Sequence, residues 1–189
     1  MYIFFDTEFT GLHKDTTLIS IGLVTENGDT FYAEFNDYDK TQCDDWIQQN
    51  VINNLYGEDK IKRLRETEYN AYVYGNKQQV VEEFRLWLEL FKDEEIQFVS
   101  DVCHYDFVLL IDLFGQAFDL PKNISAVCHD INQDLALYLD ISDGEAFDLN
   151  REEFLIDNNY KIENVNKHNS LFDAYIIKEI YNVVHGLKG

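Results

Sequence analysis

The sequence predicts an α/β domain in which helices flank a mixed sheet. Three apolar, strand-like runs come first, at residues 2–7, 18–24 and 30–35. The turn between the second and third runs contains Asn27-Gly28, a strong hairpin signal. Helical and strand-like patterns then alternate, so we expect an antiparallel three-strand meander plus parallel strands. The length of 189 residues suits one domain with a full core, spanning residues 1–189.

The later elements are identified by hydrophobic periodicity and capping residues. Expected strands are 96–100 and 125–128. Expected helices begin at Asp44 or Asp45 and run to about 55, then cover 77–92, 106–115, 131–140 and 150–158, with a last helix opening at His168-Asn169-Ser170. Between 57 and 76 the pattern weakens: basic residues at 60, 62, 63 and 65 precede three tyrosines. This segment fits either a solvated insertion or a flap that contacts phosphates and stacks bases.

Composition narrows the class of protein. The chain is 46% hydrophobic and 15% aromatic, which argues against disorder. No apolar stretch approaches membrane-spanning length, and the start lacks the basic region of a signal peptide. The three cysteines show no CxxC spacing, which is typical of reduced thiols and of neither a disulfide frame nor a zinc site. We therefore expect a cytoplasmic protein with no membrane partner.

The net charge of −21, from 15 basic and 36 acidic residues, restricts nucleic-acid binding. An extended duplex footprint draws on many contacts between Lys or Arg and phosphates, which this chain does not offer. Binding of a single chain end through metal ions is compatible with the charge. The acidity is equally compatible with a role in solubility alone.

A pair of acids closes the first predicted strand. Asp6 and Glu8 are separated by one residue, so both side chains point to the same face of the strand. Two carboxylates on one face repel each other unless a cation lies between them, and hard oxygen ligands suit Mg²⁺ or Mn²⁺. The alternative is a solvated strand end, but the apolar run before the pair favours a site.

Three residues elsewhere could complete such a site. Asp106 opens a helix, Asp173 lies in the first turns of the last helix, and His168 lies on the loop before it. Each also has an ordinary explanation, because acids are favoured at helix N-termini and a loop histidine needs no role. The remaining histidines, at positions 13, 104, 129 and 185, have no matching carboxylate spacing, and we expect His13 and His129 at the surface.

These motifs resemble the DEDDh family of 3′–5′ exonucleases, a branch of the RNase H-like fold. The matching stretches are Phe5-Asp6-Thr7-Glu8-Phe9-Thr10-Gly11-Leu12, Val102-Cys103-His104-Tyr105-Asp106 and His168-Asn169-Ser170-Leu171-Phe172-Asp173-Ala174. The first and third motifs together are specific. The second departs from the family pattern, which has Asn at the position of Val102. The neighbouring Asp101 is an alternative to Asp106, although the preceding Tyr105 and the apolar helix favour Asp106.

The resemblance implies a role for each matched residue. Asp6, Glu8, Asp106 and Asp173 would hold two ions, Mg²⁺ or Mn²⁺, with Asp6 between them. His168 would take the proton from the attacking water. Phe9, Thr10 and Leu12 would contact the terminal nucleotide. The expected activity is metal-dependent removal of nucleoside 5′-monophosphates from a single-stranded 3′ end of RNA or DNA, with RNA slightly preferred.

Two other functions stay open from the sequence. One is hydrolysis of short oligonucleotides or dinucleotides, which the acidic charge would suit. The other is a non-catalytic RNase H-like module that binds nucleic acid or protein. Analogy with family relatives also raises the possibility of a homodimer.

Overall fold

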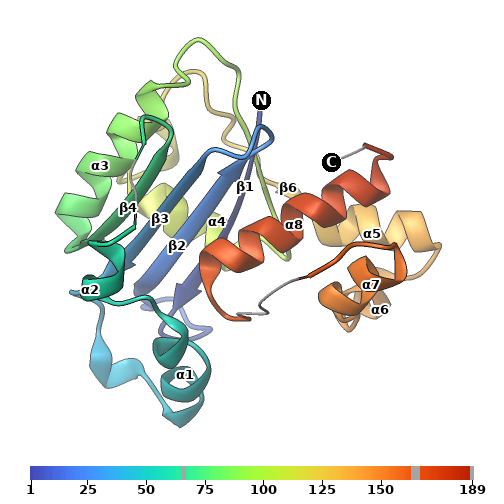
Figure 1. The fold of residues 1–189 in the computed structure, drawn as a ribbon, viewed down its shortest axis with the longest axis horizontal. Helices are drawn as coiled ribbons and strands as arrows, with labels where there is room; N and C mark the ends of the chain where they lie inside the picture. Colours follow the sequence, from blue (N-terminus) through green and yellow to red (C-terminus); the bar gives the residue numbers. More distant parts are fainter. Residues whose placement is uncertain (65–66, 163–166, 188–189) are drawn as a thin grey trace.

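A six-stranded mixed sheet organises the computed structural model, which describes residues 1–64, 67–162 and 167–187 (Figure 1). The strands are β1 (Tyr2–Phe9), β2 (Leu18–Thr25), β3 (Thr30–Phe35), β4 (Asn70–Gly75), β5 (Gln97–Ser100) and β6 (His129–Asp130), in the order β4-β3-β2-β1-β5-β6. The first three pair antiparallel, and β4, β5 and β6 each join a neighbour in parallel. The predicted meander and mixed sheet are therefore confirmed.

The helices agree with the sequence pattern in most places. They are α1 (Asp45–Asn50), α2 (Glu58–Ile61), α3 (Lys77–Glu89), α4 (His104–Asp112), α5 (Ile131–Leu139), α6 (Asp143–Phe147), α7 (Arg151–Asp157) and α8 (Ser170–Val184), with short 3₁₀ turns at Lys40–Gln42, Ile52–Asn54 and Ala117–Asp119. The expected helix to residue 55 is wrong in length, because α1 ends at Asn50 and a 3₁₀ turn follows. Helix α6 was not predicted.

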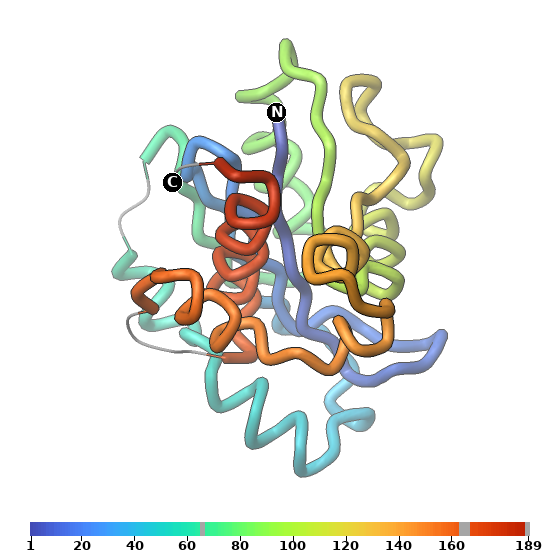
Figure 2. The backbone as a smooth tube through the Cα atoms, turned by 90° about the vertical axis from the view of Figure 1, so that its right-hand side faces the viewer, coloured from blue at the N-terminus to red at the C-terminus, as the bar shows by residue number. Residues whose placement is uncertain are grey.

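Two helical layers cover opposite faces of the sheet (Figures 1 and 2). Alternation along β1 explains the division: Ile3 and Phe5 pack into the cluster that includes α3 and α4, whereas Phe4 packs against α5, α7 and α8. Asp6 and Glu8 have the parity of Phe4 and so face α8. The acid pair thus lies on the α8 side of the strand.

A glycine lets α8 approach the sheet closely. Gly22 pairs with Asp6 across the β1–β2 ladder. A Cβ built on Gly22 would lie 2.3 Å from the backbone nitrogen of Leu171, a separation that atoms do not tolerate. Only glycine fits beneath the first turn of α8, and this contact brings the start of α8 beside the acid pair.

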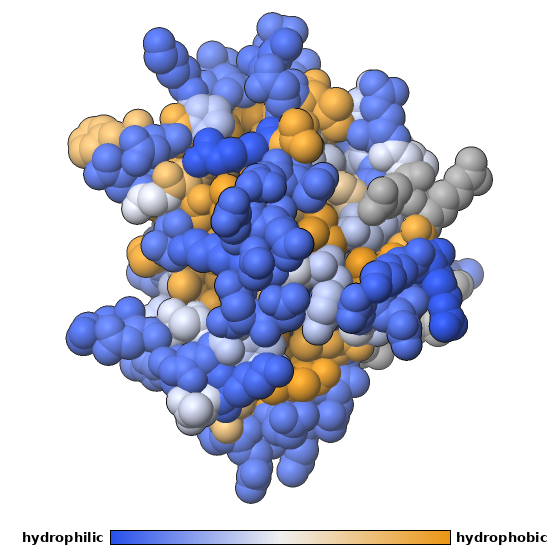
Figure 3. Space-filling model, turned by 90° about the vertical axis from the view of Figure 1, so that its left-hand side faces the viewer, coloured by the Kyte–Doolittle hydropathy of each residue, from blue (hydrophilic) through white to orange (hydrophobic). Residues whose placement is uncertain are grey.

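The expectation for the middle of the chain is wrong. Residues 70–75 form β4, an edge strand parallel to β3, rather than part of a solvated insertion or a flap. The face that holds β4 and α3 is mostly hydrophilic, with scattered apolar side chains (Figure 3). Of the basic residues before it, Arg65 lies outside the described residues.

The strand expected at 125–128 is displaced. A single bridge joins Ile96 to Ile124, and the ladder resumes only at His129, opposite Val99. Between them Ser125 Oγ accepts a hydrogen bond from the backbone N–H of Val127, at 3.2 Å. This local turn takes the chain out of the sheet and leaves Val127 exposed.

Among the described residues, no helix combines the length and apolar character needed to cross a bilayer.

Candidate active site

The acid pair lies on the part of β1 that extends beyond its pairing with β5. β5 pairs with β1 only as far as Phe4, while β1 continues to Phe9. One edge of β1 is therefore open beside Asp6 and Glu8, and both carboxylates are only partly exposed. The strand presents two acids at a position that the sheet itself does not fill.

Helix α4 fills this open edge with Asp106. Asp106 Oδ1 accepts hydrogen bonds from the Thr7 backbone N–H at 3.0 Å and from the Thr7 hydroxyl at 2.6 Å. Thr7 points away from the face that carries the acid pair, but its N–H lies in the strand edge that β5 leaves unpaired. Asp106 is thus buried and hydrogen-bonded to the residue between Asp6 and Glu8.

The neighbouring Asp101 has a different partner. Its two carboxylate oxygens accept bonds from Arg151 Nε and Nη2 at 2.7 and 3.0 Å. Arg151 also donates to the side-chain oxygen of Asn132 and to the carbonyl of Ala146. Asp101 is therefore engaged in a bidentate ion pair that joins α7 to the end of β5.

Hydrogen bonds fix the start of α8. The Asn169 side chain caps the helix by accepting from Phe172 N, and its amide donates to the Tyr32 hydroxyl at 3.1 Å. Ser170 Oγ lies 2.9 Å from Ser20 Oγ on β2. These contacts set Asp173, one turn along, beside β1.

His168 is held in an uncommon backbone conformation. Its φ of 62° lies in the left-handed region, and the residues on either side are fixed by Asn54. The side-chain amide of Asn54 donates a hydrogen bond to the carbonyl of Lys167 at 2.9 Å. The backbone carbonyl of Asn54 accepts one from the side-chain amide of Asn169 at 3.4 Å. The imidazole packs edge-on against Trp46, with ring centroids 5.1 Å apart.

The structure brings His168 to two of the acids. Ligand atoms of Glu8, His168 and Asp173 all lie within 4.8 Å of one another. These three residues come from β1, the loop before α8 and α8 itself. Such a mixed set of oxygen and nitrogen atoms could hold a metal ion.

Burial, followed by neighbouring negative charge, raises the pKa of each acid. The pKa of Asp6 is raised well above its usual value by burial, then by Asp106 and Asp173, and that of Glu8 by burial, then by Asp173 and Asp106. Burial raises the pKa of Asp106 to about 6, against the hydrogen bonds from Thr7. Burial and then Glu152 raise the pKa of Asp173 to about 7.

The charge is not balanced by basic side chains. None of the ion pairs between described residues involves Asp6, Glu8, Asp106 or Asp173. The pKa of His168 is lowered, first by burial and then by Lys167, which favours the neutral imidazole. Four converging carboxylates that form no ion pair with a basic side chain of the described residues fit divalent cations with oxygen ligands.

The three residues expected to touch a terminal nucleotide lie in different settings. Phe9 stacks on Tyr105 with centroids 5.6 Å apart. Leu12 is 78% exposed. The Thr10 hydroxyl is buried and contacts the side chains of Gln42, Thr16 and Thr17. Leu12 is thus free to contact a ligand, whereas the Thr10 side chain shapes the loop.

Several residues at the site were not identified from the sequence. Arg151 and Glu152 open α7, and Glu152 bonds to Lys167 at 3.5 Å next to Asp173. Trp46 supports His168 from α1. These residues are distant in the chain and belong to no motif, so no sequence signal marks them. His129 and His185, for which the sequence shows no matching carboxylate spacing, both contact Asp134 in the fold.

A comparison with known protein families gives a match over nearly the whole chain. The family described as 3′-5′ exoribonuclease Rv2179c-like domain matches residues 1–185. The chain belongs to this family. It is therefore a 3′–5′ exonuclease, and its fold is the RNase H-like fold of the DEDDh nucleases.

Individual relatives of this exoribonuclease-family protein are more distant. The 3′-5′ exoribonuclease Rv2179c of Mycobacterium tuberculosis (strain ATCC 25618 / H37Rv) is 26% identical over 133 residues, which cover 70% of this chain and 73% of the relative. The nuclease domain of 3′hExo, a DEDDh family member solved with rAMP bound, has a TM-score of 0.61 at 14% identity, with 97% and 90% of the two chains covered.

A second solved structure shows the same fold in a larger protein. The zinc-bound form of the E. coli ExoI–ssDNA complex has a TM-score of 0.57 at 13% identity and covers 98% of this chain but 40% of that one.

Proposed function

We propose that this exonuclease domain, residues 1–189, removes nucleoside 5′-monophosphates from the 3′ end of single-stranded RNA with the help of two divalent ions. The observation that carries the proposal is the convergence of four buried or half-buried acids and His168 at the open edge of β1, where no basic side chain among residues 1–64, 67–162 and 167–187 forms an ion pair with the acids. The nucleotide-bound and DNA-bound structures of similar fold support a nucleic-acid substrate.

The four acids would be shared between two ions. Asp6, Glu8 and Asp173 would hold one ion, and Asp6 together with Asp106 would hold the second. Mg²⁺ or Mn²⁺ bound there would stabilise charge on the attacking and leaving oxygens. The raised pKa values support this assignment, because crowded carboxylates lose their repulsion when a cation lies between them.

His168 is our candidate for the general base. Its imidazole lies beside Glu8 and Asp173, and its lowered pKa keeps it unprotonated and able to accept a proton near neutral pH. Packing on Trp46 and the fixed backbone on both sides hold the ring in one orientation. In our proposal the His168 imidazole accepts the proton of the attacking water.

The substrate would be held by its terminal nucleotide. Leu12 follows the acid pair in the chain and is exposed, and Phe9 stacks on Tyr105. The net charge of −21 leaves little attraction for a long polyanion. Short single-stranded ends, including oligonucleotides of a few residues, are the substrates that this surface suits.

A matched set of substrates tests the proposal. Linear RNA labelled at its 5′ end, the same sequence as a circle, and the matching DNA are incubated with Mg²⁺ or Mn²⁺. We expect a ladder shortened from the 3′ end on linear RNA, mononucleotide products, slower digestion of DNA and an intact circle. Cleavage of the circle, or shortening from the 5′ end, would contradict it.

The alternatives give different patterns in the same assay. Turnover of dinucleotides with no digestion of a 20-residue RNA would indicate a short-oligonucleotide hydrolase. Binding of RNA with no cleavage under either metal would indicate a non-catalytic module and would refute the enzymatic proposal.

A further inference from the structure

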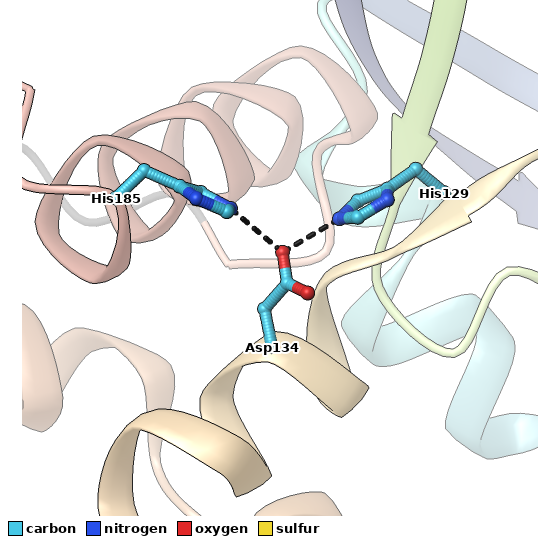
Figure 4. Close-up of side chains that lie close together, drawn as sticks. All are labelled: His129, Asp134 and His185. Atoms are coloured by element: carbon cyan, nitrogen blue, oxygen red, sulfur yellow. Dashed lines mark hydrogen bonds and ion pairs between the residues drawn. The ribbon is translucent and has the colours of Figure 1, made fainter.

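A second cluster of potential metal ligands lies at the opposite end of α8 from Asp173. His185 directly follows α8, and 12 residues at 1.5 Å each place it about 18 Å along the helix from Asp173. His129 comes from β6 and Asp134 from the first turn of α5. Three elements that are far apart in the chain thus meet here (Figure 4).

In both histidines the Nε2 atom points at the same oxygen of Asp134. His129 Nε2 lies 2.6 Å and His185 Nε2 lies 2.8 Å from Asp134 Oδ2. The second carboxylate oxygen points away from both rings (Figure 4). All three ligand atoms lie within 4.8 Å of one another.

The surroundings orient the rings. Tyr181 packs against His185 with centroids 4.2 Å apart and meets His129 edge-on at 6.0 Å. The side chains of the two histidines are 37% and 39% exposed, and that of Asp134 is 17% exposed. The set is therefore ordered by packing on one side and open to solvent on the other, as a site that admits an ion must be.

We propose that His129, Asp134 and His185 form a second metal site for a Zn²⁺-like transition ion, separate from the nuclease centre. Two imidazoles and one carboxylate, with a fourth position left for water, are a ligand set that Zn²⁺ accepts and that Mg²⁺ does not favour. In a tetrahedral site with bonds near 2.0–2.1 Å the ligand atoms lie about 3.3 Å apart. The two distances from Asp134 Oδ2 to the imidazole nitrogens, 2.6 and 2.8 Å, would lengthen by about 0.5–0.7 Å to reach that spacing.

The ion would clamp the end of α8 to β6 and α5. Its position far along α8 makes its role independent of the reacting phosphate. The prediction is that the ion raises thermal stability without being required for phosphodiester cleavage. This inference does not depend on the proposed nuclease function.

Zinc titration of the full-length chain tests the site. The Asp6→Asn/Asp173→Asn double variant removes nuclease-centre ligands, and excess Mg²⁺ fills what remains. We expect one equivalent of Zn²⁺ to bind, and a Tm rise of about 5 °C or more at 100 times the Kd. Adding His185→Gln should lower the affinity at least tenfold and abolish the shift, whereas His104→Gln, an exposed histidine on α4, should change neither.

Cobalt provides a second readout in case one variant is unstable. Co²⁺ bound to the double variant should give a visible absorption band that Asp134→Asn or His129→Gln removes and Zn²⁺ displaces. No binding of Zn²⁺ at micromolar concentration, or binding and absorption unchanged in His185→Gln and in Asp134→Asn, would overturn the proposal and leave the cluster as a hydrogen-bonded triad only.

Discussion

Single residues in the second motif have separable roles. Asp106 accepts hydrogen bonds from the backbone N–H and the hydroxyl of Thr7, whereas Asp101 forms an ion pair with Arg151. The motif contains two acids, and the sequence favours Asp106 only through Tyr105 and the helix that follows. The contacts assign them to different tasks.

Replacing each acid by its amide should separate those tasks. Asp106→Asn keeps an acceptor for Thr7 but loses the charge, so kcat should fall about 10–100-fold with little change in Tm. Asp101→Asn removes the charge that faces Arg151, so the free energy of unfolding should fall by about 2 kcal/mol while kcat stays within threefold. Steady-state kinetics and denaturant unfolding of both variants check this. The reverse pattern would make Asp101 the second-motif acid.

The pKa of His168 should determine how activity falls at low pH. Its lowered pKa means that the neutral base forms as pH rises through a value below the usual 6.5. At saturating Mg²⁺, where the acids are held ionised, activity should rise with pH up to that point and then level off. His168→Gln should lower kcat about 10²–10⁴-fold and flatten the profile. A variant that keeps the wild-type acid limb would show that another group accepts the proton.

At the scale of elements, the site depends on how closely α8 lies on the sheet. Gly22 sits under the Ser170–Leu171 backbone and is paired with Asp6. The cap residue Asn169 and the Ser20–Ser170 contact fix the same end of the helix. The distance between Asp173 and the acid pair is therefore a property of helix packing.

Gly22→Ala should move α8 and damage the site. The added Cβ would meet backbone rather than a flexible side chain, so we expect a loss of about 3 kcal/mol in the free energy of unfolding and at least tenfold weaker Mg²⁺ binding. Gly144→Ala is the matched control, because a Cβ there meets nothing within 4 Å and alanine favours the helix by up to about 1 kcal/mol. Chemical denaturation and metal titration measure both effects. Equal stability of the two variants would contradict the packing argument.

The predictable part of this architecture is the part encoded locally. The meander follows from three apolar runs and Asn27-Gly28, and the acid pair follows from alternation on one strand. By contrast, β4 was missed because its tyrosines sit on an exposed edge, which weakens the apolar pattern. The contacts of Arg151, Glu152 and Trp46, and the shared partner of His129 and His185, arise from tertiary packing that no local spacing records.

At the scale of the whole molecule, the site costs stability when it holds no cation. Asp6, Glu8, Asp106 and Asp173 all have pKa values raised by folding. The folded chain then binds more protons than the unfolded chain between about pH 4 and pH 7. The slope of stability against pH is negative in that window, so stability falls as pH rises.

The metal-free protein should therefore melt at a lower temperature at pH 8 than at pH 5. Asp173→Asn removes one of the titrating groups and should reduce the difference, and saturating Mg²⁺ should stabilise the wild type more at pH 8 than at pH 5. Scanning calorimetry in a chelator and then in Mg²⁺ gives both quantities. Because the net charge of −21 also varies with pH, the comparison with Asp173→Asn is the decisive part. An identical pH dependence of the melting temperature in that variant would show that the acids of the site do not cause the loss of stability at high pH.

The central claim is that the acids gathered at the open edge of β1 perform the hydrolysis. The most direct measurement is the single-turnover rate of 3′-nucleotide release from RNA by Asp173→Asn and by wild type, at saturating Mg²⁺ and with folding checked by circular dichroism. Loss of one ion ligand removes several kcal/mol of charge stabilisation, so we predict a rate lower by about 10³-fold or more in a folded protein. A rate within tenfold of wild type would contradict the claim and place the chemistry elsewhere.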